Sequence, residues 1–231
     1  MTYNKVVKGV FVNRPNRFIA VVDIAGKREH VHVKNTGRCK ELLLPGSDVV
    51  LFASDNPGRK TKYDLIAVYK KRRNLPPLLI NMDSQVPNDA VAEWLKECGM
   101  FSECAQIRRE VTYNSSRFDF YIEDGEKRAF LEVKGVTLES DGTAMFPDAP
   151  TERGVKHINE LVNCVSEGYM GLILFVIQMK GVNTFTTNDI THKAFGTALR
   201  NAVEHGVKVI AYDCDVTPDS IRLSSEIPVE L

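Results

Sequence analysis

The sequence lacks any long hydrophobic run and any signal-like segment at its N-terminus. Its longest apolar stretch, around residues 169–177, is far shorter than the ~20 residues that a membrane-spanning helix needs. Heptad repeats, zinc-finger spacings and the glycine-rich phosphate loop are also missing. We therefore expect a cytoplasmic globular protein with no membrane partner, and the ordinary hydrophobic fraction of 43% argues against disorder.

Cysteine is sparse and shows no pairing pattern. The five cysteines are odd in number and no two are spaced as C-x-x-C, so neither a disulfide framework nor a zinc site is indicated. We expect reduced and mostly buried thiols, with one nucleophilic cysteine as the alternative. The five are Cys39, Cys98, Cys104, Cys164 and Cys214.

The formal net charge is zero, but the charges are unevenly distributed. Residues 1–80 contain 16 Lys and Arg against 6 Asp and Glu, whereas residues 81–231 contain 14 against 24. This asymmetry predicts a basic domain that meets a polyanion and an acidic domain with another task, such as metal binding. We therefore divide the chain into a domain over residues 1–80 and a domain over residues 81–231.

The densest basic stretch lies at the end of the first domain. Basic side chains of this kind bind nucleic-acid phosphates with little dependence on sequence and with a steep dependence on salt. We predict DNA as the partner, with a solvated basic loop as the alternative. The stretch contains Arg59, Lys60, Lys62, Lys70, Lys71, Arg72 and Arg73 against only Asp64.

Residues 1–80 are typical of an all-β domain. Five short β-rich runs separated by turn residues predict a small barrel, of which the OB-fold, a binder of oligonucleotides or oligosaccharides, is the common five-stranded form. Asn35-Thr36-Gly37-Arg38 is expected to be a loop after the third strand. The prolines in Asn74-Leu75-Pro76-Pro77 predict a linker, because they remove backbone donors. The five runs are residues 5–12, 17–24, 28–33, 48–53 and 63–69.

Residues 81–231 predict a mixed sheet flanked by helices. Thr151 is a good N-cap for a helix whose apolar stripe is Val155, Ile158, Val162 and Val165, with Arg153, Lys156, His157 and Glu160 mainly off that stripe. The other expected elements are a helix over 88–98, strands over 108–113 and 171–178, a helix over 189–205, and a final strand over 207–213.

A hairpin at the centre of this domain carries the most informative charges. Residues 116–123 and 128–136 are aromatic and β-branched runs, and residues 124–127 are turn formers. In the register that this loop predicts, the residue numbers of two paired positions add to 251. Asp119 then faces Glu132. One face is then wholly apolar, with Phe118, Phe120 and Ile122 among its members, and the other carries Arg117, Asp119, Glu132 and Lys134.

Two carboxylates in opposed positions repel each other and need compensation. A hard divalent cation such as Mg²⁺ takes oxygen ligands, including one or two carboxylates, and leaves other positions to water and phosphate oxygens. Lys134, on the same face as Glu132, is placed to orient water or to stabilise negative charge. The alternative is that Glu132-Val133-Lys134 is only a solvated strand face.

The order of helix, strand, Asp…Glu-x-Lys hairpin, helix and strand resembles the core of PD-(D/E)XK nucleases. The resemblance implies that Asp119, Glu132 and Lys134 are catalytic, and that Asp119, Glu132 and the Val133 carbonyl hold Mg²⁺ or Mn²⁺. It also makes Glu93 a candidate for the additional acid that some members carry, although an exposed helix glutamate is the simpler interpretation.

Longer motifs resemble the sugar fermentation stimulation protein family, SfsA, over nearly the whole chain. They are Ser116-Arg117-Phe118-Asp119, Leu131-Glu132-Val133-Lys134, the run from Met145 to His157, and Asn35-Thr36-Gly37-Arg38. The resemblance implies an N-terminal OB-like domain, a C-terminal restriction-endonuclease-like domain, and DNA binding with a role in regulating sugar utilisation genes. The chain departs from the family pattern at His32-Val33-Lys34, where His-Cys-Pro is usual, and at Cys39, where Met is usual.

The same resemblance extends the predicted DNA contacts beyond the basic stretch. Asn35 and Arg38 belong to the loop motif, and Arg153, Lys156 and His157 are placed where the nuclease architecture allows phosphate contacts. A purely structural alternative pairs Arg153 and Lys156 with Glu152 and Glu160 on the helix surface.

Three functions remain open from the sequence. The first is a metal-dependent nuclease, and the second is a DNA-binding regulator of sugar metabolism genes that keeps the nuclease scaffold without turnover. The third is an OB-type module that binds sugars, which has little support because Trp94, the one tryptophan, falls outside the barrel. DNA binding, largely independent of sequence, is the activity that we expect.

Overall fold

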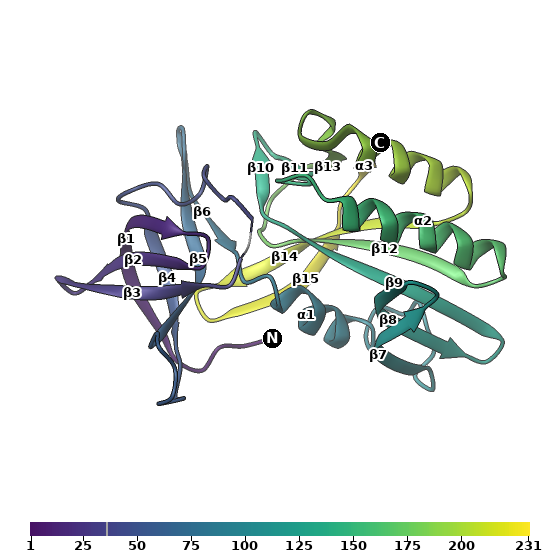
Figure 1. Cartoon of the computed structure of the whole chain (residues 1–231), viewed down its shortest axis with the longest axis horizontal. Coiled ribbons are helices and arrows are strands. Elements are labelled where there is room, and N and C mark those ends of the chain that lie inside the picture. The colour runs from purple at the N-terminus through teal and green to yellow at the C-terminus, as the bar shows by residue number, and fades with distance from the viewer. Residues whose placement is uncertain (36) are drawn as a thin grey trace.

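The computed structural model describes residues 1–35 and 37–231, so Thr36 of the predicted loop lies outside the described residues. A β-barrel formed by the N-terminal third of the chain lies beside a mixed α/β domain (Figure 1). This arrangement confirms the expected fold class, an OB-like barrel followed by a mixed sheet flanked by helices. No helix among the described residues combines the length and the apolar character that crossing a bilayer requires.

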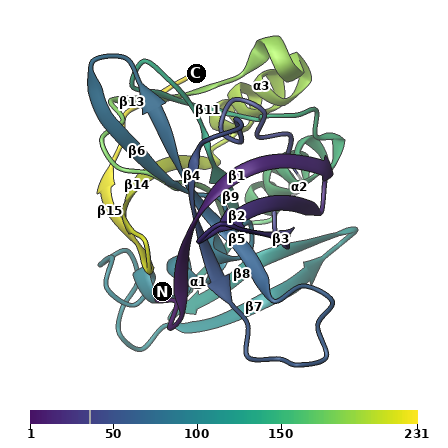
Figure 2. The same ribbon diagram turned by 90° about the vertical axis from the view of Figure 1, so that its left-hand side faces the viewer.

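The barrel strands follow the order β3-β2-β1-β4-β5, and a short parallel pairing between β3 and β5 closes the ring (Figures 1 and 2). Buried residues such as Val22, Val31, Leu51 and Leu65 fill its interior. The strands are β1 (Val6–Asn16), β2 (Ile19–Ile24), β3 (Lys27–Val33), β4 (Asp48–Ala53) and β5 (Tyr63–Arg72).

The segment expected to be a linker is a sixth strand, β6 (Leu75–Asn81), which pairs with β5. The expectation of an interrupted chain at Pro76 and Pro77 was therefore wrong. Because β6 lies at the edge of its sheet, prolines that cannot donate hydrogen bonds are tolerated there. The barrel sheet consequently extends toward the second domain.

The second domain is built on a six-stranded sheet of order β15-β14-β12-β9-β8-β7. A smaller sheet has the order β10-β11-β13-β16. The elements are α1 (Val86–Trp94), β7 (Gln106–Tyr113), β8 (Ser116–Asp124), β9 (Lys127–Val136), β10 (Leu138–Ser140), β11 (Thr143–Phe146), α2 (Glu152–Ser166), β12 (Met170–Ile177), β13 (Thr184–Thr187), α3 (Asp189–Glu204), β14 (Lys208–Thr217), β15 (Ser220–Glu226) and β16 (Val229–Glu230). Strand β14 is thus not the final one, contrary to expectation.

Helix α1 covers one face of this sheet, and α2 and α3 cover the other (Figure 1). Residues of β12 alternate between the two cores: Leu172 and Leu174 pack with the α1 side, and Ile173 and Phe175 pack with the α2 and α3 side. Burial on both faces explains why β12 is an unbroken hydrophobic run in the sequence.

Helix α2 begins where the sequence predicts, because the Thr151 hydroxyl accepts a hydrogen bond from the Gly154 amide. Of the predicted stripe, Ile158 is buried and the three valines pack against the core while partly exposed, so the fully buried face is shifted around the helix. That face consists of Gly154, His157, Ile158, Leu161 and Cys164. His157, expected off the apolar stripe, is buried because a carboxylate of the sheet binds its ring, as described below.

Asp64 is a buried charge of the barrel whose electrostatics can be tested. Its carboxylate, 1% exposed, accepts hydrogen bonds from Arg59 Nη1 at 2.9 Å and meets His32 Nδ1 at 3.0 Å. Burial raises the pKa of Asp64, but the hydrogen bonds from Arg59 and His32 outweigh burial and hold the pKa below its ordinary value. A depressed folded-state pKa stabilises the fold above the ordinary pKa, and this contribution is lost as the pH falls through the folded-state pKa.

We expect Asp64→Asn to lower the free energy of unfolding at about pH 7 by about 1–3 kcal/mol, because Arg59 and His32 lose a charged partner. The loss should shrink as the solution is acidified, since the Asp64 carboxyl of the unaltered protein is then protonated and neutral, like the asparagine of the variant. Urea unfolding at neutral and acidic pH measures both effects. Asp55→Asn is the control, because Asp55 is 72% exposed and pairs with Lys5 at the surface; an equal loss in both variants would contradict the prediction.

Candidate metal and nucleic-acid site

The central hairpin has the predicted register over most of its length. Strands β8 and β9 pair Phe120 with Leu131 and Ile122 with Ala129. Asp124 and Lys127 also pair, so the loop is shorter than expected. The turn chemistry and the alternation of the two runs were therefore sufficient to place the strands correctly.

The ladder between the two strands stops before Asp119. Instead of lying opposite Glu132 as a strand pair, Asp119 accepts a hydrogen bond from the Val133 amide on Oδ2 at 2.8 Å. The alternation of β8 breaks at the same point, because Phe118 packs on the α2 side of the sheet and Phe120 on the α1 side. The expected apolar face is therefore confirmed except at Phe118, since its other members lie together on the α1 side: Phe120, Ile122, Ala129, Leu131 and Val133.

Asn88, in the first turn of α1, was missed by the sequence reasoning. Its side-chain amide donates to Asp119 Oδ1 at 2.7 Å, so both oxygens of Asp119 are oriented by the protein. Burial and the nearby Glu132 carboxylate raise the pKa of Asp119. The hydrogen bonds from Val133 and Asn88 lower it, but the net shift is upward. No sequence signal marked Asn88 apart from its place near the start of a predicted helix.

Glu132 is the most constrained acid of the hairpin, with 3% of its surface exposed. Its Oε1 accepts hydrogen bonds from Lys134 Nζ and from His157 Nδ1, the latter at 2.6 Å. Burial raises the pKa of Glu132, but the hydrogen bond from His157 and the charge of Lys134 outweigh it and lower the pKa overall. Oε2 is buried and has no partner among the described residues.

His157, on helix α2, orients the Glu132 carboxylate. Its Nε2 accepts a hydrogen bond from Arg153 Nε at 3.3 Å, so the neutral ring with its proton on Nδ1 satisfies both contacts. The ring is 5% exposed and lies against Phe118. The structure thus places His157 inside the protein, and the link from Arg153 to His157 to Glu132 connects the helix surface with the acid.

The donor set of this site fits a hard divalent cation. An orphaned buried carboxylate oxygen costs free energy unless something pairs with it, and Glu132 Oε2 lies beside a second carboxylate whose pKa it perturbs. No group of three or more His, Cys, Asp or Glu side chains within the described residues is arranged to hold a metal. The oxygen ligands at this position are the carboxylates of Asp119 and Glu132, and Mg²⁺ sites that retain several waters use one or two carboxylates.

Arg153 and Lys156 lie on the exposed side of α2. Lys156 Nζ donates to the Ser115 carbonyl at 2.7 Å, and Arg153 donates to His157 as described. The alternative of ion pairs with Glu152 and Glu160 does not occur in the described part of the chain. Arg153 is therefore linked to Glu132 through His157, whereas Lys156 is held at the turn before β8.

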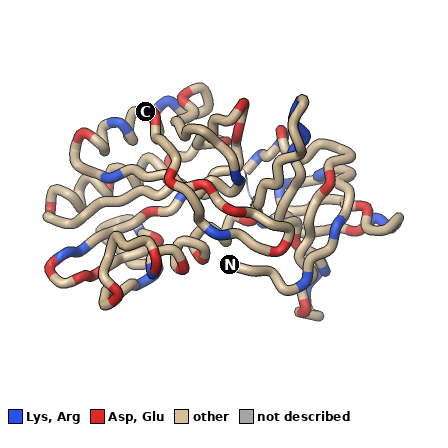
Figure 3. Tube along the Cα trace, turned by 180° about the vertical axis from the view of Figure 1, so that it is seen from behind, with Lys and Arg blue, Asp and Glu red and all other residues tan. Residues whose placement is uncertain are grey.

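The basic stretch of the first domain is divided by the fold. Arg59, Lys60 and Lys62 precede β5, whereas Lys70 to Arg73 lie at its other end, and a strand of this length separates its ends by about 3.3 Å per residue. In Figure 3 the basic positions occur all around the barrel. The stretch is therefore two separate basic groups.

Several members of these groups already have protein partners. Arg59 pairs with Asp64, and Lys70 Nζ contacts Glu139 Oε2 and the Glu139 carbonyl, each at 2.6 Å. Lys62 lies over the ring of Tyr63, and Arg72 Nε donates to the Pro76 carbonyl. Among the predicted DNA contacts of this domain, the exposed cations are Lys60, Lys62, Lys71, Arg73 and, in the loop after β3, Arg38.

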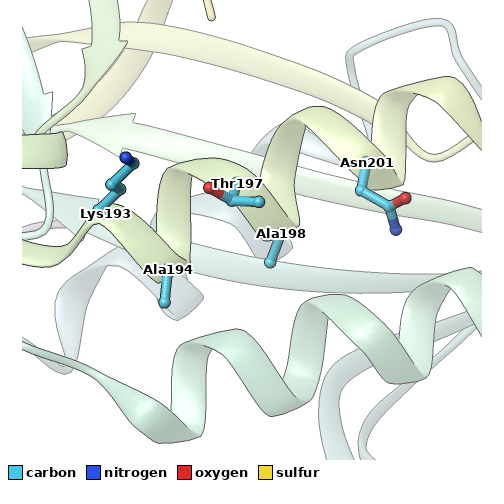
Figure 4. Close-up of a pocket in the computed structure, with 5 residues that line it drawn as sticks. All are labelled: Lys193, Ala194, Thr197, Ala198 and Asn201. Carbon is cyan, nitrogen blue, oxygen red and sulfur yellow. The ribbon is translucent and has the colours of Figure 1, made fainter.

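Two further features lie apart from the acids. Glu93 pairs with the N-terminal amine at 2.5 Å and is 56% exposed, so it makes no contact with Asp119. A shallow hollow of about 550 Å³ lies over α3 (Figure 4). None of the predicted site residues lines this hollow. Its lining residues are Lys193, Ala194, Thr197, Ala198 and Asn201.

A closed OB-type barrel followed by a mixed sheet, with an Asp…Glu-x-Lys hairpin at its centre, defines a two-part protein of the OB plus restriction-endonuclease-like class. Family models agree with both parts. The SfsA N-terminal OB domain matches residues 12–75, and the sugar fermentation stimulation protein RE domain matches residues 85–220. The chain belongs to the sugar fermentation stimulation protein family.

Individual relatives cover the full chain. The sugar fermentation stimulation protein homolog of Desulfitobacterium hafniense strain Y51 is 55% identical over 231 residues, spanning 100% of this chain and 99% of that protein. The Clostridium beijerinckii homolog is 52% identical over 100% of both chains. The solved structure of Pyrococcus furiosus SfsA in complex with Ca²⁺ matches with a TM-score of 0.88 at 27% identity, covering 100% of this chain and 98% of that one.

Proposed function

We propose that this protein is a cytoplasmic DNA-binding protein whose second domain carries a divalent-metal nuclease site on Asp119, Glu132 and Lys134. The observation that carries the proposal is the buried, unpartnered Glu132 Oε2 beside Asp119, with a lysine and an arginine within the same cluster. A family member solved with Ca²⁺ adds support, because Ca²⁺ and Mg²⁺ both prefer oxygen ligands. A phosphodiester is the substrate that such a cluster suits.

Each residue has a distinct task in this proposal. When bound, Mg²⁺ or Mn²⁺ supplies Lewis-acid activation of the phosphate and of a water molecule. Asp119, fixed by Asn88 and Val133, and Glu132 Oε2 would hold the ion. His157 carries its proton on Nδ1 and donates a hydrogen bond to Glu132 Oε1, which leaves Oε2 free for the ion. Lys134 Nζ steadies negative charge on the reacting phosphate.

DNA binding itself is testable without metal. We expect replacement of both Lys71 and Arg73 by alanine to weaken binding and to flatten its dependence on salt, because each phosphate contact contributes about 0.9 to the logarithmic slope for duplex DNA. Fluorescence anisotropy in EDTA at several salt concentrations measures both effects. Lys208→Ala, an exposed lysine of the second domain, is the matched control. An affinity that is indifferent to salt would count against DNA as the partner.

A second function is favoured by the hydrogen bonds of the acids. Asp119 accepts one on each oxygen and Glu132 accepts two on Oε1, so most of the cluster is satisfied by the protein alone. The corresponding proposal is a DNA-binding regulator of sugar metabolism genes that does not cleave. Cleavage that requires Asp119 separates the two proposals, and the experiment is set out in the Discussion.

A further inference from the structure

A cleft between the barrel and the second domain is not used by the functions proposed above. It encloses about 380 Å³, which lies within the range of small-ligand pockets. Its walls are Arg17, Asn35 and Gly37 of the barrel, Ser84 of the connection, Gly135 and Thr137 of the second domain, residues 146–151, and Gln178.

The barrel wall of the cleft is fixed by one guanidinium group. Arg14 donates hydrogen bonds to the carbonyls of Arg17, Asn35, Gly37 and Arg38. Gly37 also lies so close to Asp148 that a Cβ atom would collide with its carboxylate. The described part of the loop after β3 is thus held against the second domain, and this wall is formed before any ligand arrives.

The opposite wall is equally well supported. The Gln178 side-chain amide donates to Asn81 Oδ1 and to the Asp83 carbonyl, each at 3.1 Å. Phe146 packs against Phe175 and Phe195 of the core, with ring centroids 5.6 Å and 5.0 Å apart. Both walls therefore present defined surfaces.

Two residues of the cleft wall are neighbours in the chain of residues in the acid cluster. Gly135, in its wall, directly follows Lys134 in β9, and Thr151, also in its wall, caps the helix that carries Arg153 and His157. The cleft wall and the acid cluster thus share strand β9 and the start of helix α2. At the other rim, the Arg17 guanidinium lies 4.6 Å from the centre of the Phe18 ring, which is 44% exposed.

The lining combines apolar surfaces with hydrogen-bonding groups. Phe146, Pro147, Ala149 and Pro150 provide flat apolar contact, and the polar residues of the wall offer amide, hydroxyl and carboxylate groups. This combination suits a nucleobase, which has apolar faces and a polar edge. A base that stays stacked in a duplex cannot place both faces between the walls of a cleft, so the ligand has to be unstacked.

We infer that this cleft holds one unstacked nucleotide of single-stranded DNA next to the phosphate at Asp119 and Glu132. The inference rests on the proposed DNA binding and deepens it, because it names the single strand, or a frayed end, as the substrate class. Arg17 meets the neighbouring phosphate, and Phe18 is available for stacking with the next base.

The test compares a fluorescent single strand with a blunt duplex by anisotropy in EDTA, so that no turnover occurs. Ala149→Leu and Ser84→Leu add bulk to two different walls of the cleft. Each is expected to weaken single-strand binding about tenfold, the equivalent of about 1.4 kcal/mol, and to leave duplex binding unchanged. Ala194→Leu, in the hollow of α3, is the matched control and should change neither.

A second measurement needs no substitution. A single strand that keeps its phosphates but lacks its bases should bind the unaltered protein about tenfold more weakly than the normal strand, because base stacking is lost. Equal affinity for strands with and without bases, or variants that weaken duplex and single strand alike, would overturn the cleft inference and leave DNA binding standing. Failure to bind either DNA would overturn both proposals.

Discussion

Replacing Asp119 by asparagine is expected to lower metal-dependent DNA cleavage about 10³-fold, the upper range for loss of one group that stabilises transition-state charge. The reason is that a neutral amide of the same shape attracts a divalent ion far less than a carboxylate does. Asp119 already lies beside Glu132 in a mostly buried site, where charge has large effects. Cleavage of labelled single strands with Mg²⁺ and with Mn²⁺ measures the loss.

The control for this substitution is Asp89→Asn in the same helix turn as Asn88. Asp89 pairs with Arg109 at the surface and is 47% exposed, so its loss should leave cleavage intact. DNA affinity in EDTA should be preserved in both variants. Cleavage that persists unchanged in Asp119→Asn would show that a contaminating nuclease causes it, and absence of cleavage in the unaltered protein would favour the regulator without turnover.

The second large effect concerns the core behind the cleft. Phe175 is fully buried in β12 and touches the rings of Phe146, Phe185 and Phe195. Truncating it to alanine removes these contacts and leaves a cavity, which is expected to cost about 3–5 kcal/mol of unfolding free energy. Urea unfolding monitored by circular dichroism measures the change in midpoint and slope.

Phe18→Ala is the matched comparison, because Phe18 is 44% exposed on the barrel surface. Its effect on stability should stay within about 0.5 kcal/mol, as for most surface substitutions. A loss below about 1 kcal/mol for Phe175→Ala would mean that the cluster of phenylalanines around Phe146 is loosely packed. The rigid wall assigned to the cleft would then lose its support.

The sequence was sufficient for features that depend on local chemistry. The hairpin register followed from its turn residues and alternation, and the start of α2 followed from Thr151, because a capping hydroxyl acts within one turn. The five barrel strands followed from β-rich runs between turns. Strand β6 could not be predicted in the same way. Proline argues against a strand unless the strand lies at the edge of a sheet, and the sequence does not show which strands lie at an edge.

The contacts within the candidate site could not be predicted from local sequence patterns. Asn88 meets Asp119 across 31 positions of sequence, and His157 meets Glu132 across 25. The burial of His157 depends on a carboxylate in another element, so apolar periodicity alone assigned it to the wrong face of α2. The ion pair of Lys70 could not be predicted either, because its partner Glu139 lies 69 positions away in the sequence. Such pairs follow from tertiary packing, which overrides patterns of period 3.6 or 2.

Strand β6 also has a consequence for how the molecule behaves in a crowded solution. It is the outermost strand of its sheet, and Pro76 and Pro77 are exposed there. An unprotected outer strand recruits strands from other molecules and promotes aggregation, and proline together with nearby lysine is a natural defence against it. The residues that looked like a break in the chain therefore protect the protein from polymerising through this edge.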